Sequence, residues 1–260
     1  MSWRGGFLGL GARAMARRYA LYWRPAPGPL AGFGADWLGW DPARGATVPA
    51  NGLAGLAPGT QERVTATPRK YGLHATLKPP FRLAERCDLE GLQAACQRLA
   101  DQVAPVTLDG LAVAQMGRFL ALRPVGETRA LDALARMLVE VLDPFRAPLT
   151  EAELAKRRKA RLTPAEDALL LRWGYPFVME AFRFHVTLTG PLDEAERAVI
   201  TPALERALAP LLPRPFVIDA FTLLEERNGF FHDLHRYTLA GDSAASAAAT
   251  VASSWPSFET

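Results

Sequence analysis

Hydrophobic and polar residues repeat with two different spacings along this chain, and these spacings predict its strands and helices. Strict alternation predicts strands, whereas apolar residues three or four positions apart predict amphipathic helices. The predicted strands are 19–23, 69–80, 106–114, 119–125, 182–190, 216–224 and 230–240. Predicted helices begin at Asp88, at about Thr128 and at Asp193. Between the first two strands, residues up to about Thr67 are rich in Pro and Gly and predict a loop.

A change of pattern between about 147 and 179 indicates a helical insertion. Thr150 and Thr163 each precede a glutamate by three residues, which is the spacing of a capping box, so two short helices are expected. The first of them would carry a basic run over 156–161. A solvated helix face explains such a run, and a lid that faces the substrate is the alternative.

The order strand, helix, strand, strand occurs before this insertion and again after it. Neighbouring strands joined by tight turns, with helices to one side, predict an α+β fold with two antiparallel sheets. We expect one domain over 18–240, made of lobe 1 (about 18–146), the helical insertion (about 147–179) and lobe 2 (about 180–240). Residues 1–17 are expected to be an N-terminal extension, and 241–260 a disordered tail.

Composition excludes several classes of protein. With 260 residues, of which 49% are hydrophobic and 22% charged, the chain can bury a large core, so a disordered, collagenous or disulfide-stapled protein is excluded. Its two cysteines have no metal-ligand or redox spacing and fit a reducing, cytoplasmic location. No apolar stretch approaches 18 residues, so no transmembrane helix and no membrane partner are expected. The net charge of +3 would help to attract a phosphate but does not by itself indicate nucleic acid.

Histidine is scarce, and two of the four histidines lie in matching places. The head strands of the two units contain His74-Ala-Thr76-Leu and His185-Val-Thr187-Leu. Because side chains two apart on a strand point to the same face, each histidine projects together with its threonine. The opposite face of each strand is apolar.

A histidine beside a hydroxyl on a polar face is a place for an anion. Threonine donates a hydrogen bond to a phosphate oxygen, and histidine exchanges a proton near pH 7. If the two units face each other, one imidazole can deprotonate water while the other protonates the leaving oxygen, without a metal or cofactor. By strand parity, Lys78 and Arg183 share this face and are candidates for neutralising phosphate charge.

At these residues the sequence resembles the two-histidine (2H) phosphoesterase superfamily. The stretches YGLHATLKPPF and FRFHVTLTGPL, with the opening RYALYWRP, are similar to the branch of that superfamily encoded beside phosphonate-degradation genes. The resemblance implies a bilobal α+β fold with a pseudo-twofold axis and outer helices. It also implies that His74 and His185 are catalytic, as acid and base respectively, and that Thr76 and Thr187 bind phosphate.

The same resemblance raises interest in Tyr71, although parity on a regular strand would place Tyr71 on the core side. It implies a small cyclic phosphate as the substrate, for instance a ribose cyclic phosphate, and no obligate protein partner. An RNA end with a 2′,3′-cyclic phosphate is the alternative substrate, which would need stacking aromatics of the kind that Trp37, Trp40, Trp173, Phe230 and Phe231 offer.

Two further hypotheses belong to other classes. The chain could be a binding module that captures a nucleotide or RNA end without turnover, but binding alone does not require two proton-transfer groups. It could also be a metal-dependent hydrolase that uses His232, His235 and Asp233, although a polar turn explains these residues better.

Overall fold

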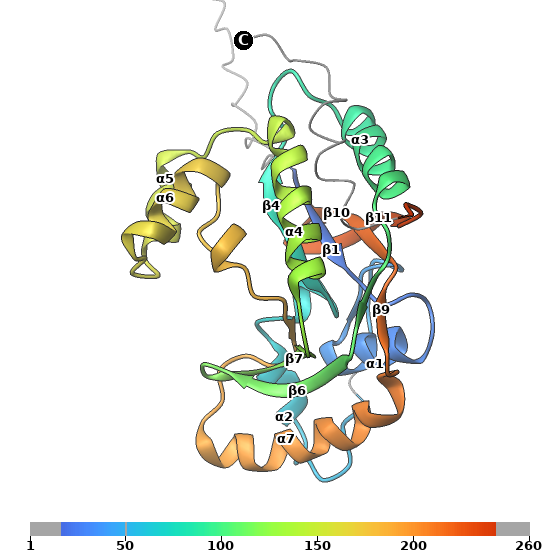
Figure 1. Ribbon diagram of the computed structural model, residues 1–260. Helices are drawn as coiled ribbons and strands as arrows, with labels where there is room; N and C mark the ends of the chain where they lie inside the picture. Colours follow the sequence, from blue (N-terminus) through green and yellow to red (C-terminus); the bar gives the residue numbers. More distant parts are fainter. Residues whose placement is uncertain (1–16, 50, 243–260) are drawn as a thin grey trace, which may run out of the picture.

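The computed structural model describes residues 17–49 and 51–242, which form a mixed α/β structure around one antiparallel sheet (Figure 1). Seven strands form this sheet in the order β11-β10-β1-β4-β8-β7-β6. In chain order they are β1 (Arg18–Trp23), β4 (Ala75–Arg82), β6 (Gly110–Met116), β7 (Phe119–Val125), β8 (Val186–Thr187), β10 (Ala220–Arg227) and β11 (Phe230–Thr238). Two small ribbons accompany it, β2 (Trp40–Asp41) with β3 (Ala46–Thr47), and β5 (Val106–Leu108) with β9 (Phe216–Ile218).

The strand order shows that the two sequence units exchange their hairpins. The hairpin β6–β7 of the first unit pairs with β8, the head strand of the second unit. The hairpin β10–β11 of the second unit pairs with β1, which lies next to β4, the head strand of the first unit. Each unit therefore contributes strands to both halves of the sheet, and the head strands β4 and β8 meet in the middle.

Helices begin where the sequence supplies caps. Asp88 accepts a hydrogen bond from the Gly91 amide at the start of α3, and Thr150, Thr163 and Asp193 form complete capping boxes before α5, α6 and α7. The helices are α1 (Pro29–Leu38), α2 (Thr60–Thr65), α3 (Leu89–Gln102), α4 (Arg129–Val141), α5 (Glu151–Arg158), α6 (Pro164–Trp173) and α7 (Glu194–Leu208). The predicted helices at Asp88, Thr128 and Asp193 and both helices of the insertion are thus confirmed.

The predicted loop up to Thr67 is wrong, because this segment contains α1 and α2. Pro29 stands in the first turn of α1, where its missing amide hydrogen costs nothing, and Gly39 ends the helix with a positive φ of 74°. The Pro and Gly residues that suggested a loop therefore mark the start and the end of a helix.

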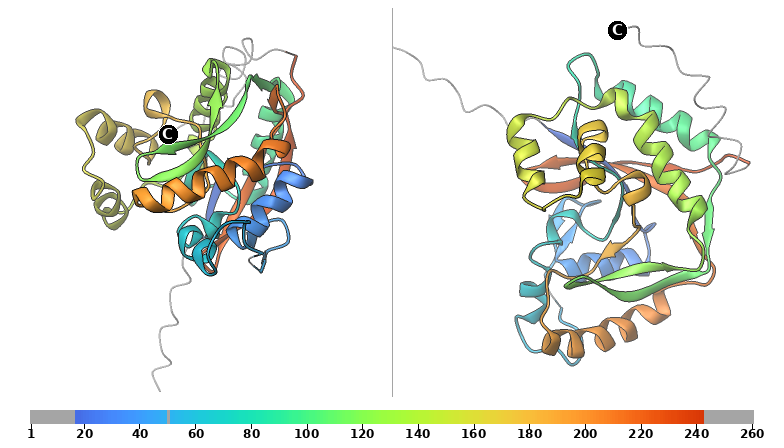
Figure 2. Two further views of the ribbon diagram at one scale, coloured as in Figure 1. Left: turned by 90° about the horizontal axis from the view of Figure 1, so that it is seen from below. Right: turned by 60° about the vertical axis from the view of Figure 1, so that its left-hand side comes forward.

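The helices cover the sheet from different sides (Figures 1 and 2). α3 and α4 pack along the part of the sheet that contains β4 and β11, and α7 lies across β6 and β7. α5 and α6 stand apart from this body and come forward in the right-hand view of Figure 2. None of the described helices is long and apolar enough to span a membrane.

One face of the sheet packs into the main core, and the other carries polar and aromatic side chains. Leu21, Leu77, Leu122 and Val186 belong to the core cluster and are at most 1% exposed. Tyr22 lies in a separate cluster on the opposite face. The expected N-terminal extension (1–17) and C-terminal tail (241–260) fall almost entirely outside the described residues.

Candidate active site

The two His-x-Thr motifs lie on neighbouring antiparallel strands and meet in register. Ala75 of β4 pairs with Val186 of β8. This register sets His74 opposite Thr187, and Thr76 opposite His185, on the face that is turned away from the core. Cross-strand neighbours have Cβ atoms about 5 Å apart and diagonal neighbours about 7–8 Å apart, so all four side chains can surround one phosphate.

Both histidines have their ring orientation fixed in the same way. The Nδ1 atom of His74 lies 3.0 Å from the carbonyl oxygen of Gly72, and that of His185 lies 2.7 Å from the carbonyl oxygen of Arg183. Because a carbonyl oxygen only accepts hydrogen bonds, each Nδ1 carries the hydrogen and donates it. Each Nε2 atom is thereby left to exchange a proton with a ligand.

The surroundings of the two rings differ. The His74 ring is 9% exposed and packs against Tyr22 and Tyr71, with ring centroids 4.3 Å and 5.2 Å apart. Burial above all, together with the positive charges of Arg24 and His185, lowers the pKa of His74 to about 3, against the opposing effect of the hydrogen bond to Gly72. His74 is therefore neutral at pH 7, whereas the His185 ring is more exposed and faces Phe119 at 6.0 Å.

The two threonines complete the polar face. Both side chains are partly exposed, and across residues 17–49 and 51–242 neither hydroxyl has a protein hydrogen-bond partner. Each hydroxyl can therefore donate to a ligand oxygen without first breaking a bond inside the protein. The arrangement offers two proton-transfer atoms and two neutral donors on one patch of sheet.

Tyr71 lies beside His74, contrary to the parity of a regular strand. The strand does not extend back to residue 69, because Arg69–Tyr71 form a 3₁₀ turn and Gly72 follows with a φ of 66°. This break turns the Tyr71 ring onto the same side as His74, where it also stacks on Phe231 with ring centroids 5.2 Å apart. The predicted strand around His185 is also shorter than expected, since only Val186–Thr187 pair as a strand.

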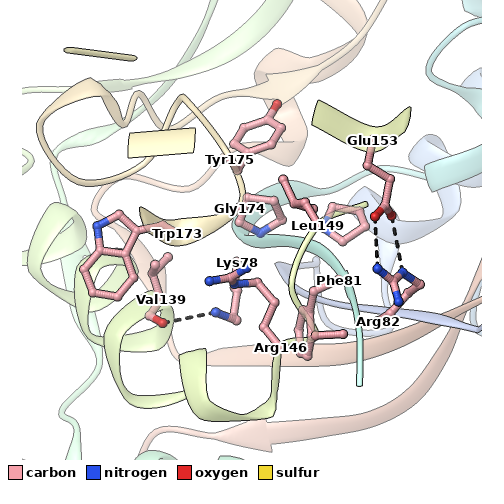
Figure 3. Close-up of a pocket in the computed structure, with 13 residues that line it drawn as sticks. Lys78, Phe81, Arg82, Val139, Arg146, Leu149, Glu153, Trp173, Gly174 and Tyr175 are labelled. Atoms are coloured by element: carbon pink, nitrogen blue, oxygen red, sulfur yellow. Dashed lines mark hydrogen bonds and ion pairs between the residues drawn. The ribbon is translucent and has the colours of Figure 1, made fainter. Parts of the chain in front are cut away.

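Lys78 does not join this group, because β4 contains a bulge. Thr76 pairs with Tyr22, but Lys78 pairs with Leu21, so one residue of β4 between them is left over. The extra residue moves Lys78 to the core side, where it is 2% exposed and its Nζ donates to the carbonyl oxygen of Val139 at 3.1 Å (Figure 3). The parity that placed Lys78 beside Thr76 is therefore wrong.

The Arg183 guanidinium is bound to nearby backbone carbonyl groups. Its side chain is exposed, and Nη1 donates to the backbone oxygens of Glu180 and Phe182 at 2.9 Å and 2.6 Å. The carbonyl of Arg183, rather than its guanidinium, acts in the site, because it accepts the hydrogen from His185.

Sequence reasoning missed two side chains on the same face. Tyr22 pairs with Thr76 across β1 and β4, and its ring contacts His74. Arg123 is exposed and stands two residues beyond Ala121, the β7 partner of Thr187, so it continues the face on which His185 lies. The alternation of 119–125 contained the signal for Arg123, but only the strand order shows that β7 lies next to β8.

Among the described residues, His232, His235 and Asp233 do not form the ligand cluster that the alternative metal centre requires. In the described part of the chain, no group of three or more His, Cys, Asp or Glu side chains is arranged to hold a metal ion. His232 packs edge-on against Trp40 with ring centroids 5.2 Å apart, and His235 against Tyr237 at 4.5 Å. Both lie in strand β11, rather than in the polar turn expected for them.

Several solved structures show a weak likeness to this chain, and two of them cover most of its length. The crystal structure of E. coli LigT complexed with NADP⁺ is 18% identical, with a TM-score of 0.39, over 87% of this chain and 99% of that chain. A crystal structure titled phosphoesterase is 20% identical, with a TM-score of 0.37, over 86% of this chain and 98% of that one.

Curated relatives match more closely in sequence. A protein of Janthinobacterium sp. (strain Marseille) named ribose 1,5-bisphosphate phosphokinase PhnN is 40% identical over 214 residues, which is 80% of this chain and 47% of that protein. A protein of the same name in Laribacter hongkongensis (strain HLHK9) is 38% identical over 182 residues, 69% of this chain and 41% of its own length. This chain therefore spans less than half the length of the curated relatives that it matches.

A family model matches the part of the chain that holds most of the site. The match covers residues 76–231, from the first threonine through the insertion and β8 into β11. The family is described as a protein of unknown function, DUF1045. This match spans more than half of the sequence, and the chain belongs to the DUF1045 family.

Proposed function

We propose that this protein is a cyclic phosphodiesterase that hydrolyses a small cyclic phosphate by acid–base catalysis with two histidines. The observation that carries the proposal is the pairing of Ala75 with Val186, which sets both His-x-Thr motifs on one polar face. The matching Nδ1 hydrogen bonds support it, because they leave both Nε2 atoms available for proton transfer. The likeness of the motifs to those of 2H phosphoesterases agrees with this activity.

The reaction uses each group once. One Nε2 takes a proton from water as the water oxygen bonds to phosphorus, and one P–O bond of the ring breaks. The second Nε2 gives its proton to the departing oxygen, so the product is an acyclic phosphomonoester with a free hydroxyl. Thr76 and Thr187 donate hydrogen bonds to the non-bridging oxygens, and each proton transfer contributes about 10²- to 10⁴-fold in rate.

The two environments favour His74 as the base. A neutral imidazole whose Nδ1 hydrogen is held by Gly72 has a free lone pair on Nε2, as a base requires. His185 is more exposed and then serves as the acid. This assignment reverses the roles that the superfamily resemblance implied.

A small sugar phosphate is the substrate class that we favour. The curated relatives are named for ribose 1,5-bisphosphate, and the motifs resemble the branch encoded beside phosphonate-degradation genes. An RNA end has weaker support, because Trp37, Trp40 and Phe231 are at most 6% exposed and cannot stack on bases from their present positions.

The test is a screen of ribose 1,2-cyclic phosphate and nucleoside 2′,3′-cyclic phosphates with EDTA present. We expect turnover of at least one of them, with kcat about 10²- to 10⁴-fold lower in H74Q and in H185Q. H235Q is the matched control, because His235 is exposed on β11 and should keep full activity.

Two outcomes would contradict the proposal. Activity that disappears with EDTA and returns with a divalent cation would indicate a metal-dependent reaction. Tight binding without turnover would instead support the module that captures a nucleotide or RNA end.

A further inference from the structure

Four arginines gather where the helical insertion meets the start of β1 and the end of β4. Arg18 of β1 pairs with Arg82 of β4 across the strands. The Arg82 guanidinium binds the Glu153 carboxylate of α5 at 3.0 Å (Figure 3). Arg157 stands four residues after Glu153 and therefore lies on the same face of α5, turned toward the sheet. The fourth, Arg146, lines the pocket with Arg82 and Glu153.

Three of these arginines have a carboxylate partner. Arg18 is 2.6 Å from Glu226, Arg82 is 3.0 Å from Glu153, and Arg146 is 2.7 Å from Asp143. Acids therefore balance these three positive charges within the cluster.

Arg157 is the exception. Its side chain is half-buried, and across residues 17–49 and 51–242 its guanidinium has no hydrogen bond and no ion pair within 4 Å. Burial lowers its pKa, and the nearby charges of Arg18 and Arg146 act in the same direction, with Glu153 opposing them. The cluster therefore holds one positive charge without an acidic partner at a half-buried position, where water and salt screen the attraction for an anion less than at an exposed one.

Three tyrosines that interact electrostatically with one another link this cluster to the histidine site. The Tyr22 ring packs on His74, Tyr71 lies beside both, and Tyr175, just after α6, lines the pocket that holds Arg82 and Arg146 (Figure 3). Tyr22 is 1% exposed, yet in the described part of the chain its hydroxyl has no protein partner, and the same is true of the Tyr175 hydroxyl. The Tyr22 and Tyr175 hydroxyls and the Arg157 guanidinium are therefore all free to bind a ligand without first breaking a hydrogen bond inside the protein.

We propose that Arg157 and Tyr175 of the helical insertion form a second anion subsite, which binds a phosphomonoester carried by the same small substrate whose cyclic phosphate lies at His74 and His185. This inference rests on the proposed function. On β1, Tyr22 and Arg18 are four residues apart, about 13 Å along the strand. A pentose with phosphates at both ends, together with the reach of an arginine side chain, can bridge this distance.

The subsite gives a role to Arg157, which is half-buried, whereas Lys156, Arg158 and Lys159 of the same basic run are exposed. A guanidinium binds phosphate oxygens through two parallel hydrogen bonds, and a phenol hydroxyl adds a third donor. Each hydrogen bond to a charged group contributes about 1.5–3 kcal/mol, roughly a 10- to 150-fold effect on affinity. The insertion is then a specificity element that selects bisphosphorylated substrates.

The experiment compares two matched substrates, ribose 1,2-cyclic phosphate with and without a 5-phosphate, on the full-length protein. For wild type we expect kcat/KM to be larger for the 5-phosphate form, mainly through a lower KM. R157Q and Y175F should reduce this preference about 10- to 100-fold. K156Q is the matched control, because Lys156 is an exposed cation on the same helix and its loss removes the same charge.

Direct binding separates the two proposals. Calorimetry with ribose 5-phosphate needs no turnover, and we expect binding by wild type and K156Q that is lost in R157Q. Such binding in a protein that hydrolyses neither cyclic phosphate would refute the phosphodiesterase and keep the anion subsite. Equal turnover of the two substrates, or an equal effect of R157Q and K156Q, would overturn the subsite.

Discussion

The two candidate catalytic histidines each make the same kind of hydrogen bond, but their surroundings differ. Each histidine donates from Nδ1 to the carbonyl two residues earlier, yet His74 is packed between Tyr22 and Tyr71 while His185 is partly exposed. The repeated motif could be read from the sequence, because spacing alone defines it. The difference in burial between the two rings could not be predicted, because it depends on which side chains pack against each ring after folding.

Burial of His74 predicts a specific dependence of stability on pH. In the unfolded chain the histidine takes up a proton below its ordinary pKa of about 6.5, whereas in the folded protein it stays neutral down to a pKa of about 3. Acidification between these values therefore favours unfolding. Relative to H74Q, wild type should lose roughly 2 kcal/mol more of its free energy of unfolding between pH 7 and pH 5. Urea titrations at the two pH values measure this difference, and equal losses in both proteins would show that His74 is not buried as a neutral ring.

At the scale of the element, caps and periods predicted α3 to α7, whereas α1 and α2 were missed. The capping boxes at Thr150 and Thr163 were visible in the sequence because they need only local contacts. The bulge in β4 was not visible, because it is fixed by pairing with β1, more than fifty residues away along the chain. One extra residue in a strand reverses the parity of all that follow, and for this reason Lys78 was assigned to the wrong face.

A buried lysine on the core side should reduce stability. Burial lowers the pKa of Lys78 to about 7, against the attraction of Asp143, and Asp143 has a second partner in Arg146. We expect K78M to raise the free energy of unfolding at pH 7 by about 1–4 kcal/mol, because it removes a desolvated charge and leaves the carboxylate paired.

The lowered pKa of Lys78 also determines the direction in which the free energy of unfolding changes with pH. The wild-type protein gains stability as the pH rises from about 7 toward 10.5, since only its unfolded chain still binds the proton. The advantage of K78M should therefore shrink over this range in denaturant titrations. A large loss of activity in K78M with an unchanged fold would instead place Lys78 in contact with the substrate.

At the scale of the whole molecule, the sequence predicted two similar units but not how they combine. Element order along the chain suggested lobes at 18–146 and 180–240, whereas the sheet places the hairpin of each unit beside strands of the other. Strand pairing between distant segments leaves no local pattern, so the exchange had to come from the structure. Because of the exchange, neither half of the chain can complete its part of the sheet alone.

The shared sheet predicts that the domain unfolds as one cooperative unit. Leu122 is fully buried in β7, where it pairs with Val186, and L122A should lower the free energy of unfolding by about 2–5 kcal/mol. The buried Trp23 lies on β1, and Trp40 donates to the carbonyl oxygen of Phe231 in β11, so these two tryptophans report on the other end of the sheet, whereas Trp37 donates to Leu188 beside β7. If the domain is cooperative, L122A shifts the urea midpoint by the same amount in fluorescence and in far-ultraviolet circular dichroism. Separate transitions, with the fluorescence midpoint unchanged, would show instead that the two ends of the sheet unfold independently.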